Sequence, residues 1–398
     1  METTQKIMAN RGKERPRETD YDDAVLFPHD VIEDILAKLP VKTLIRFKSV
    51  SKQWCFSIDN PNFTRQHLSN QRKKDAGFLF AYRGYNDTTG FSKEIGLCSM
   101  AENYKISRIR FSNILPQDRY NMSHSCDGII CFYGQFNIHL INYSTLEIRT
   151  LPPGILSSPH LCQYTYPDPY FPGGFIHVGL WRSPRYQLGI GCDEVTKQYK
   201  IVKVFDPVLD DFWLGNSNCE IFTLDRNPYA YWKYIGFVPY KISVTANPVH
   251  VNGAIYWFTD EIYHGNKSEV IVMFDLHREN FQAIPHPSCC SDPTKPRNTM
   301  QLVTLRGSLC LLERLIDESE LNLWIMKTCE ISKVVTWENT HFLKFTRQIG
   351  PRFAVAENKD GEIVTYDWED QGGQMFAATT FIDSLVPLYG QRVQHIDI

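Results

Sequence analysis

The sequence has no run of about 18 apolar residues, the length that a helix needs to cross a membrane. It has no excess of one charge, since the formal net charge is −3 over 398 residues, and no dense cluster of Lys and Arg for non-specific nucleic-acid binding. Residues 1–23 are polar and lack the apolar core of a secretory signal. We therefore expect a protein of the cytoplasm, the nucleus or both, with no membrane and no nucleic acid among its partners.

The 11 cysteines and 12 histidines are scattered, without the paired Cys or His spacing of a structural zinc site. The sequence thus predicts no metal site and no cofactor. Four cysteines lie among apolar, strand-like residues, where buried and reduced thiols are expected: Cys126, Cys131, Cys192 and Cys310. Cys289 and Cys290 are adjacent in a polar loop, where a reactive thiol is the alternative to a structural role.

Residues 27–58 carry three short amphipathic helical patterns. Pro28 suits the first turn of a helix, and Pro40 ends that helix because the residue before a proline is pushed out of helical geometry. Apolar residues recur at helical spacing in the first two runs, and the third adds aromatic residues: Val31, Ile35, Leu36 and Leu39; Val41, Leu44, Ile45 and Phe47; Trp54, Phe56 and Ile58. So short a module buries too little to stand alone, and we expect a partner to cover part of it.

These residues resemble the F-box motif. The matching pieces are Phe27-Pro28, Ile35-Leu36, Leu39-Pro40-Val41-Lys42, Leu44, Phe47, Val50-Ser51-Lys52 and Trp54, with Phe27 in place of the usual leucine. The resemblance implies docking onto a Skp-family adaptor and, through it, onto the cullin of a ubiquitin ligase. The adaptor-binding residues are expected among Phe27, Pro28, Ile35, Leu36, Leu39, Pro40, Val41, Leu44, Phe47, Val50 and Trp54. Sequence alone does not separate these contacts from the module's own interior, and a bundle that packs only against its own chain is the alternative.

Beyond residue 70 the pattern changes to strands and turns with a weak internal repeat. A polar residue, a glycine and an apolar strand recur around Gly128, Gly253, Gly307 and Gly361, and the last three glycines are spaced 54 residues apart. A second polar turn in each unit adds another hairpin. Two hairpins in about 50 residues make one four-stranded propeller blade, because blades repeat radially and shield each other's edges. Two stacked β-sheets are the alternative.

This long region also resembles the F-box-associated domain of plant F-box proteins. The resemblance rests on pieces in the same order, each weak by itself: residues 125–131, Asn142-Tyr143-Ser144-Thr145, residues 189–193, Tyr199-Lys200-Ile201-Val202, residues 251–257, Phe274-Asp275-Leu276, residues 307–311 and residues 323–327. Asn142-Tyr143-Ser144-Thr145 departs from the family's more frequent Asn-Pro-Ser-Thr.

The predicted fold class is therefore α+β in several domains: a small all-α F-box module and a large all-β, propeller-like (kelch-like) domain of about six blades. The predicted boundaries are a disordered tail at 1–24, the F-box at 25–70, a linker at 71–76, the β-rich substrate-recognition domain at 77–390 and a C-terminal tail at 391–398.

The function that the resemblance implies is a substrate-recognition subunit of a Skp-cullin-F-box ubiquitin ligase, whose β domain captures an unidentified protein for ubiquitination. We expect no catalysis by the chain, since it lacks the eight ligands of a RING and any recognisable nucleophilic cysteine. One alternative is an adaptor-bound scaffold or interaction protein that acts without cullin. The other is a propeller enzyme, but its acidic candidates show no catalytic spacing: Asp260, Glu261, Asp317, Glu318 and Glu320.

Three aromatic-rich insertions are the candidate substrate-binding loops, because exposed aromatic residues are favoured contact groups. Their candidate residues are Tyr166, Tyr170, Phe171, Phe212, Trp213, Tyr229, Tyr231 and Trp232. The alternative is that these side chains cover the outer faces of neighbouring blades. The sequence does not say which protein is bound, nor whether a small molecule or a modification is needed.

Overall fold

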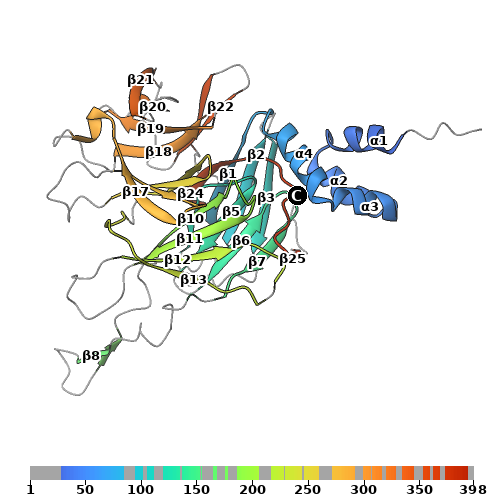
Figure 1. The fold of residues 1–398 in the computed structure, drawn as a ribbon, viewed down its shortest axis with the longest axis horizontal. Helices are drawn as coiled ribbons and strands as arrows, with labels where there is room; N and C mark the ends of the chain where they lie inside the picture. The colour runs from blue at the N-terminus through green and yellow to red at the C-terminus, as the bar shows by residue number, and fades with distance from the viewer. Residues whose placement is uncertain are drawn as a thin grey trace, which may run out of the picture.

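The fold is that of a computed structural model, with the helices at one side of a large β domain (Figure 1). The structure describes residues 28–84, 95–101, 105–111, 120–134, 137–152, 154, 165–167, 175–177, 186–205, 217–227, 229–243, 246–259, 271–291, 299–305, 307–315, 320–328, 334–344, 353–358, 362–367 and 373–392. The predicted tail at 1–24 lies outside these residues. None of the described helices is long and apolar enough to cross a membrane.

The predicted helical module consists of α1 (His29–Leu36), α2 (Val41–Phe47), α3 (Lys52–Ile58) and α4 (Pro61–Gln71). Pro28 and Pro40 directly precede α1 and α2. The Ser51 hydroxyl accepts a hydrogen bond from the Trp54 backbone N–H, and the Asn60 side chain accepts one from Asn62. These side chains cap α3 and α4, because they satisfy backbone donors that a helix start leaves unpaired.

The other described residues form antiparallel sheets, of which four have four strands and one has five. In each sheet the strands are given in the order in which neighbours pair. The first sheet has β24 (Gly373–Phe381), β1 (Gly77–Gly84), β2 (Ile95–Ala101) and β3 (Lys105–Phe111); the second has β4 (Asn121–Met122), β5 (Ile129–Tyr133), β6 (Ile138–Asn142), β7 (Glu147–Thr150) and β25 (Gln391–Arg392); the third has β10 (Tyr186–Cys192), β11 (Tyr199–Phe205), β12 (Asn218–Thr223) and β13 (Lys233–Phe237); the fourth has β14 (Val249–Val251), β15 (Ala254–Phe258), β16 (Ile271–Asp275) and β17 (Asn280–Ile284); the fifth has β18 (Met300–Leu305), β19 (Ser308–Arg314), β20 (Glu320–Thr328) and β21 (Val335–Lys344). A short 3₁₀ helix, η3 (Ser288–Ser291), follows β17.

These five sheets are the blades of a propeller, which confirms the predicted fold class and lowers the predicted blade number from about six to five. The repeat at Gly361 accounts for the difference, since the residues described there form only the two-stranded sheet of β22 (Phe353–Glu357) and β23 (Ile363–Asp367). Another two-stranded sheet pairs β8 (Thr165–Pro167) with β9 (Phe175–His177). The ring closes where β24 pairs with β1, so segments from both ends of the described chain share one blade.

Two kinds of turn explain the repeat seen in the sequence. In the first, both central residues have positive φ, as a type I′ hairpin turn requires: 49° and 79° at Asp127-Gly128, and 48° and 77° at Asn252-Gly253. In the second, an Asn or Asp side-chain oxygen accepts two backbone N–H bonds and the residue four positions later has positive φ. This second turn occurs at Asn142 with Leu146, Asp193 with Lys197, and Asp275 with Glu279.

The first turns of neighbouring blades gather at one end of the propeller. The Asp127 carboxylate accepts a hydrogen bond from the Tyr199 hydroxyl, and the Asn252 side chain donates to the Gly307 carbonyl. Because antiparallel strands alternate in direction, the connections β7–β10 and β11–β12 begin and end at the opposite end of their blades. The β12–β13 connection instead leaves from the same end as the β10–β11 turn. The three aromatic insertions therefore do not all belong to one end of the propeller.

Candidate functional site

Four large apolar side chains of the helical module are exposed to solvent. The exposed fractions are 41% for Val31, 53% for Ile35, 62% for Val50 and 77% for Phe56. We call these four residues the exposed helical face. They come from α1, α3 and the turn between α2 and α3, whereas α4 lies next to the blades (Figure 1). Large apolar side chains that stay exposed on so small a module favour a contact with another protein.

The structure separates the predicted adaptor-binding residues into interior and surface. Leu36, Val41 and Leu44 are at most 2% exposed and pack with Ile58 and Phe63, so their prediction as surface contacts is corrected. They hold the helices together, because burying them is what stabilises so small a module. Leu39, Phe47 and Trp54 are partly buried beside this core, whereas Pro28, Ile35, Pro40 and Val50 are exposed. Phe27 lies outside the described residues.

Val31 and Phe56 belong to the exposed helical face but are absent from the predicted contact set. For Phe56 the signal was present in the helical pattern. Ile58 of α3 is only 1% exposed and faces the core. Phe56, two positions earlier, points roughly 200° away from Ile58 around the helix axis, toward solvent.

The predicted substrate-binding residues have different outcomes. Tyr229 is 85% exposed and Tyr231 is 78% exposed, which leaves both available to a partner. Trp232 is 1% exposed, so its prediction as a surface contact is corrected. Its indole N–H donates to the Pro152 carbonyl at 2.8 Å, and its ring packs on Phe222. The backbone of Tyr166 lies in β8, and four predicted residues lie outside the described part of the chain: Tyr170, Phe171, Phe212 and Trp213.

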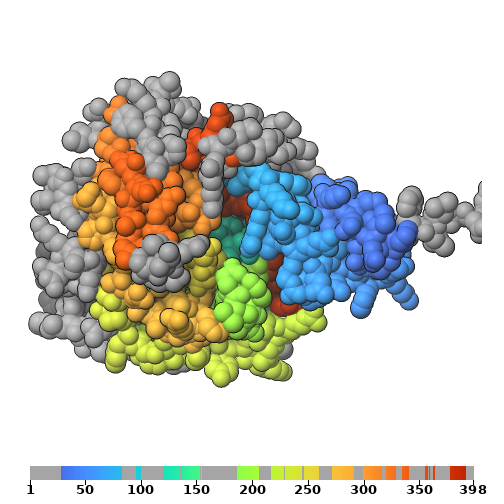
Figure 2. Space-filling model, turned by 45° about the horizontal axis from the view of Figure 1, so that its top comes forward, coloured from blue at the N-terminus to red at the C-terminus, as the bar shows by residue number. Residues whose placement is uncertain are grey.

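Exposed aromatic side chains continue along the outermost strand of the third blade. Phe237 is 71% exposed and Tyr234 is 43% exposed, and both belong to β13. With Tyr229 and Tyr231 they form what we call the β13 aromatic surface. The yellow-green segment that includes residues 229–237 lies along the lower edge of the propeller in Figure 2, while the blue helical module projects from its side. This surface is the best-described candidate for substrate contact.

The helical module meets the propeller through α4. The Arg72 guanidinium donates to both carboxylate oxygens of Asp127, at 2.7 and 2.9 Å, and Asp127 is also bonded by Tyr199. Leu68 of α4 is 7% exposed and packs in an apolar cluster with residues of the blades. Two-point Arg–carboxylate bonds fix direction as well as distance, so α4 is held in one orientation on the turn end of the propeller.

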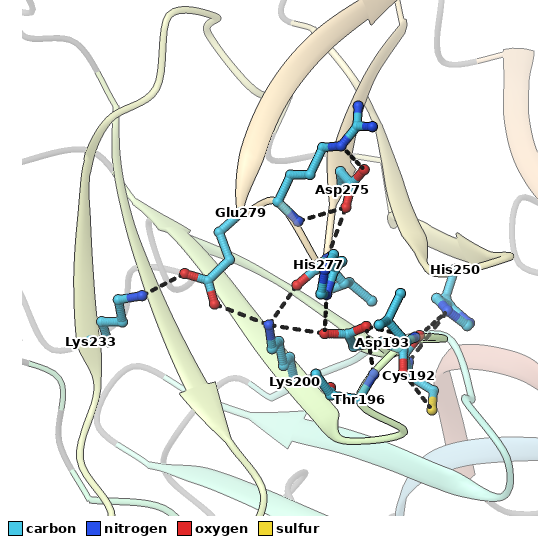
Figure 3. A network of polar contacts seen from close by, with 12 residues as sticks. Cys192, Asp193, Thr196, Lys200, Lys233, His250, Asp275, His277 and Glu279 are labelled. Carbon is cyan, nitrogen blue, oxygen red and sulfur yellow. Dashed lines mark hydrogen bonds and ion pairs between the residues drawn. The ribbon is translucent and has the colours of Figure 1, made fainter.

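A network of charged residues fastens the third blade to the fourth (Figure 3). Asp193 is fully buried, and its carboxylate lies 3.4 Å from both Lys200 Nζ and His277 Nδ1. Lys200 Nζ also donates to the Leu276 carbonyl at 2.6 Å and to Glu279 at 3.0 Å. Glu279 in turn accepts from Lys233 at 2.6 Å. The charges neutralise one another, so the network is suited to holding blades together.

A cysteine and a histidine lie near this network without the properties of a catalytic pair. Cys126 Sγ is 3.6 Å from His250 Nδ1, and the Cys192 backbone N–H donates to His250 Nε2 at 3.3 Å. Burial raises the pKa of the Cys126 thiol well above its usual value and lowers the pKa of His250. Both groups are therefore neutral at pH 7, whereas a nucleophilic cysteine is stabilised as the thiolate. Among the residues that the structure describes, no three His, Cys, Asp or Glu side chains are placed to hold a metal ion.

Comparison with known proteins agrees with this geometry. Residues 91–380 match the family model described as the F-box associated beta propeller domain, and residues 26–66 match the F-box domain. The chain belongs to the family of F-box proteins with an F-box-associated propeller. The propeller includes β1, which precedes the matched residues, because β1 pairs with β24 to close the ring.

Relatives of this F-box protein occur in Arabidopsis thaliana. An F-box/LRR-repeat protein is 28% identical over 363 residues, which cover 85% of this chain and 74% of the relative. An F-box/LRR-repeat/kelch-repeat protein is 30% identical over 263 residues, covering 65% of this chain and 63% of the relative. The alignment with the solved structure of YjhT covers 75% of this chain and 97% of the YjhT chain, with 10% sequence identity and a TM-score of 0.37.

Buried neutral histidines make the propeller of this F-box protein sensitive to acid. His139 in β6 is 8% exposed, and burial lowers its pKa to about 4. Because this pKa is below the unfolded value of about 6.5, the unfolded chain binds the proton more readily, and stability is lost as pH falls below about 6.5. Between pH 7 and pH 5 we expect His139 to account for a loss of about 2 kcal/mol in the free energy of unfolding.

Urea unfolding of the wild type and of His139→Gln at both pH values measures this contribution. Between pH 7 and pH 5 the free energy of unfolding of the variant should fall by about 2 kcal/mol less than that of the wild type. An equal loss in the two proteins would show that His139 does not carry the acid sensitivity.

Proposed function

We propose that this chain is the substrate-recognition subunit of a Skp-cullin-F-box ubiquitin ligase. The observation that carries the proposal is the exposed helical face on an F-box module that is fixed to a propeller by α4. The F-box helices bind a Skp-family adaptor, and cullin joins through that adaptor. The propeller binds the protein that is to be ubiquitinated.

The receptor acts by proximity and supplies no chemistry of its own. Holding a substrate beside a charged ubiquitin-conjugating enzyme raises the effective concentration of its lysines, as any tethered encounter does. A rigid junction favours this role, because a fixed orientation narrows the region that the substrate explores. The Arg72–Asp127 contact supports such a junction.

The proposed compartment is the cytoplasm, the nucleus or both. Seven of the nine cysteines that the structure describes are buried, and none of the nine is in a disulfide. Cysteines without disulfides at this frequency fit a reducing compartment better than the secretory route.

The β13 aromatic surface is the proposed substrate contact. Aromatic anchors at the centre of an interface each contribute about 2 kcal/mol or more when truncated. Replacing Tyr229, Tyr231 and Phe237 together with serine should therefore weaken substrate binding at least ~100-fold, while adaptor binding stays at the wild-type level. The matched control is Val195→Ser, which removes an apolar side chain that is 68% exposed on a different turn.

The measurement is a comparison of proteins captured from plant extract by the wild type, the triple variant and the control, each with adaptor bound. Candidates lost only by the triple variant are then tested for ubiquitination by the reconstituted ligase. Ubiquitination that depends on the three aromatic residues supports the proposal. If a protein is captured and ubiquitinated equally well with the wild type and with the triple variant, its binding site lies elsewhere on the propeller.

The second candidate function is a scaffold that binds adaptor without cullin. The same exposed helical face supports it, since adaptor docking is common to both functions. Recovery of adaptor with no cullin in a reconstitution with purified components would favour the scaffold.

A further inference from the structure

The segment between β24 and β25 runs between the F-box helices and the blades. We call residues 382–390 the β24–β25 strap; in Figure 1 it is part of the red chain beside α4. It has no regular secondary structure, yet several of its side chains are buried: Ser384 is fully buried, and Leu385, Val386 and Leu388 are at most 6% exposed. A segment this well buried is a structural part of the molecule.

Side chains of the strap enter two different cores. Leu385 packs in the core of the helical module with Leu36, Val41 and Leu44. Val386 and Leu388 pack instead in the cluster of the blades, which also contains Leu68 of α4. The strap thus contributes to both domains within four residues.

Polar contacts fix the backbone of the strap on the second blade. The Asn142 side chain donates to the carbonyls of Ser384 and Val386, at 3.2 and 2.9 Å. The Ser144 hydroxyl donates to Asp383 at 2.9 Å, and the Leu388 backbone N–H donates to Glu147 at 2.8 Å. Because Asn142 and Ser144 are buried, displacing the strap would leave their polar groups without these partners.

The strap also passes tightly over the turn that holds α4. A Cβ atom added to Gly128 would lie 2.6 Å from both the Ile382 carbonyl oxygen and Ser384 Cβ. The neighbouring residue, Asp127, is the one that binds Arg72, the residue that directly follows α4. The strap, this turn and α4 therefore meet at one point of the junction.

We propose that the β24–β25 strap is an integral part of the F-box core, so that the helical module reaches its full stability only when the propeller ring is closed. The strap continues directly from β24, the strand that pairs with β1 to close the ring. Ring closure places Leu385 in the helical core, which is too small to lose a buried leucine without consequence. An open or misassembled propeller would then present a loosened F-box, which couples adaptor binding to correct folding of the substrate domain.

Hydrogen exchange of the full-length chain tests the coupling. Leu385→Ala should raise the exchange rates of the protected amides in α1–α4 at least ~30-fold, as expected for the loss of a buried leucine, and leave the strands β18–β21 unchanged. The matched control is Leu302→Ala, which removes a leucine that is 2% exposed in β18 and should affect that blade but not the helices. Leu385→Val, a smaller change, should give an intermediate effect and guards against a failure of Leu385→Ala to fold.

Helices that exchange at the wild-type rate in both Leu385 variants would overturn the coupling, as would equal effects on helices and all blades. The consequence for adaptor binding rests on the proposed function, but the exchange measurement does not. If helices loosen in Leu385→Ala while the wild type binds no adaptor, the strap inference stands and the proposed function fails. If adaptor binds the wild type and Leu385→Ala equally with unchanged exchange, the proposed function stands and the strap inference fails.

Discussion

Replacing both Ile35 and Phe56 with aspartate is expected to abolish binding to a Skp-family adaptor while the chain stays folded. The two side chains are 53% and 77% exposed, so the free protein loses little packing. In the complex each would place a carboxylate in a desolvated apolar contact with no partner. Two such changes at central anchors should lower affinity at least ~1,000-fold, since each truncation alone typically costs about 2 kcal/mol or more.

Calorimetric titration with purified adaptor measures the affinity, and thermal unfolding checks the fold. Val334→Asp is the matched control, because Val334 is 54% exposed but lies in the propeller. Leu44→Ala is the opposite case: Leu44 is fully buried, and its loss should weaken binding by destabilising the helices. Undiminished adaptor affinity in a folded Ile35→Asp, Phe56→Asp protein would show that the exposed helical face is not the docking surface.

The second large effect is expected at Asp193. Replacing it with alanine should lower the free energy of unfolding by about 3 kcal/mol, because the backbone N–H groups of Val195 and Thr196 lose their acceptor and the buried Lys200 is left with the carboxylate of Glu279. Burial alone would raise the pKa of Asp193, but hydrogen bonds from Thr196, Val195 and His277 outweigh it and hold the pKa well below its usual value. The carboxylate therefore contributes its stability throughout the range above its unfolded pKa, and that contribution is lost only in strong acid.

Urea unfolding at pH 7 measures the effect of Asp193→Ala. Asp193→Asn should lower the free energy of unfolding by less, since the amide oxygen can still accept the backbone N–H bonds of the turn and only the charge is lost. Glu194→Ala is the control: its ion pair with Lys197 is half exposed, and its loss should leave the free energy of unfolding nearly unchanged. A loss from Asp193→Ala no larger than that from Glu194→Ala would mean that the network does not fasten the blades.

Local features of the fold were predictable because they depend on neighbours in the sequence. Asp127-Gly128 and Asn252-Gly253 could be recognised as hairpin turns, since few other residues tolerate positive φ at both positions. The beginnings of α1 and α2, directly after Pro28 and Pro40, were predictable because proline fits the start of a helix and ends a preceding one. Repetition of these signals was enough to predict a propeller, but the repeat at Gly361 has only two described strands and made the predicted blade number too high.

Features that depend on long-range contacts could not be predicted. Nothing near Leu385 in the sequence shows that it packs among helices more than 300 residues earlier. Likewise, the sequence showed Trp232 as one more aromatic residue of an insertion, and only the fold shows that it is 1% exposed and bonded to Pro152. The exposed and buried members of the F-box motif are equally apolar, so only the packing of four helices separates Ile35 from Leu36.

Co-purification of the full-length chain with purified Skp-family adaptor and cullin is the most direct test of whether this chain is a ligase receptor. We expect one stable complex containing all three proteins, and we expect the Ile35→Asp, Phe56→Asp variant to elute alone. If the folded wild-type chain elutes without adaptor, the assignment as a ligase receptor is contradicted.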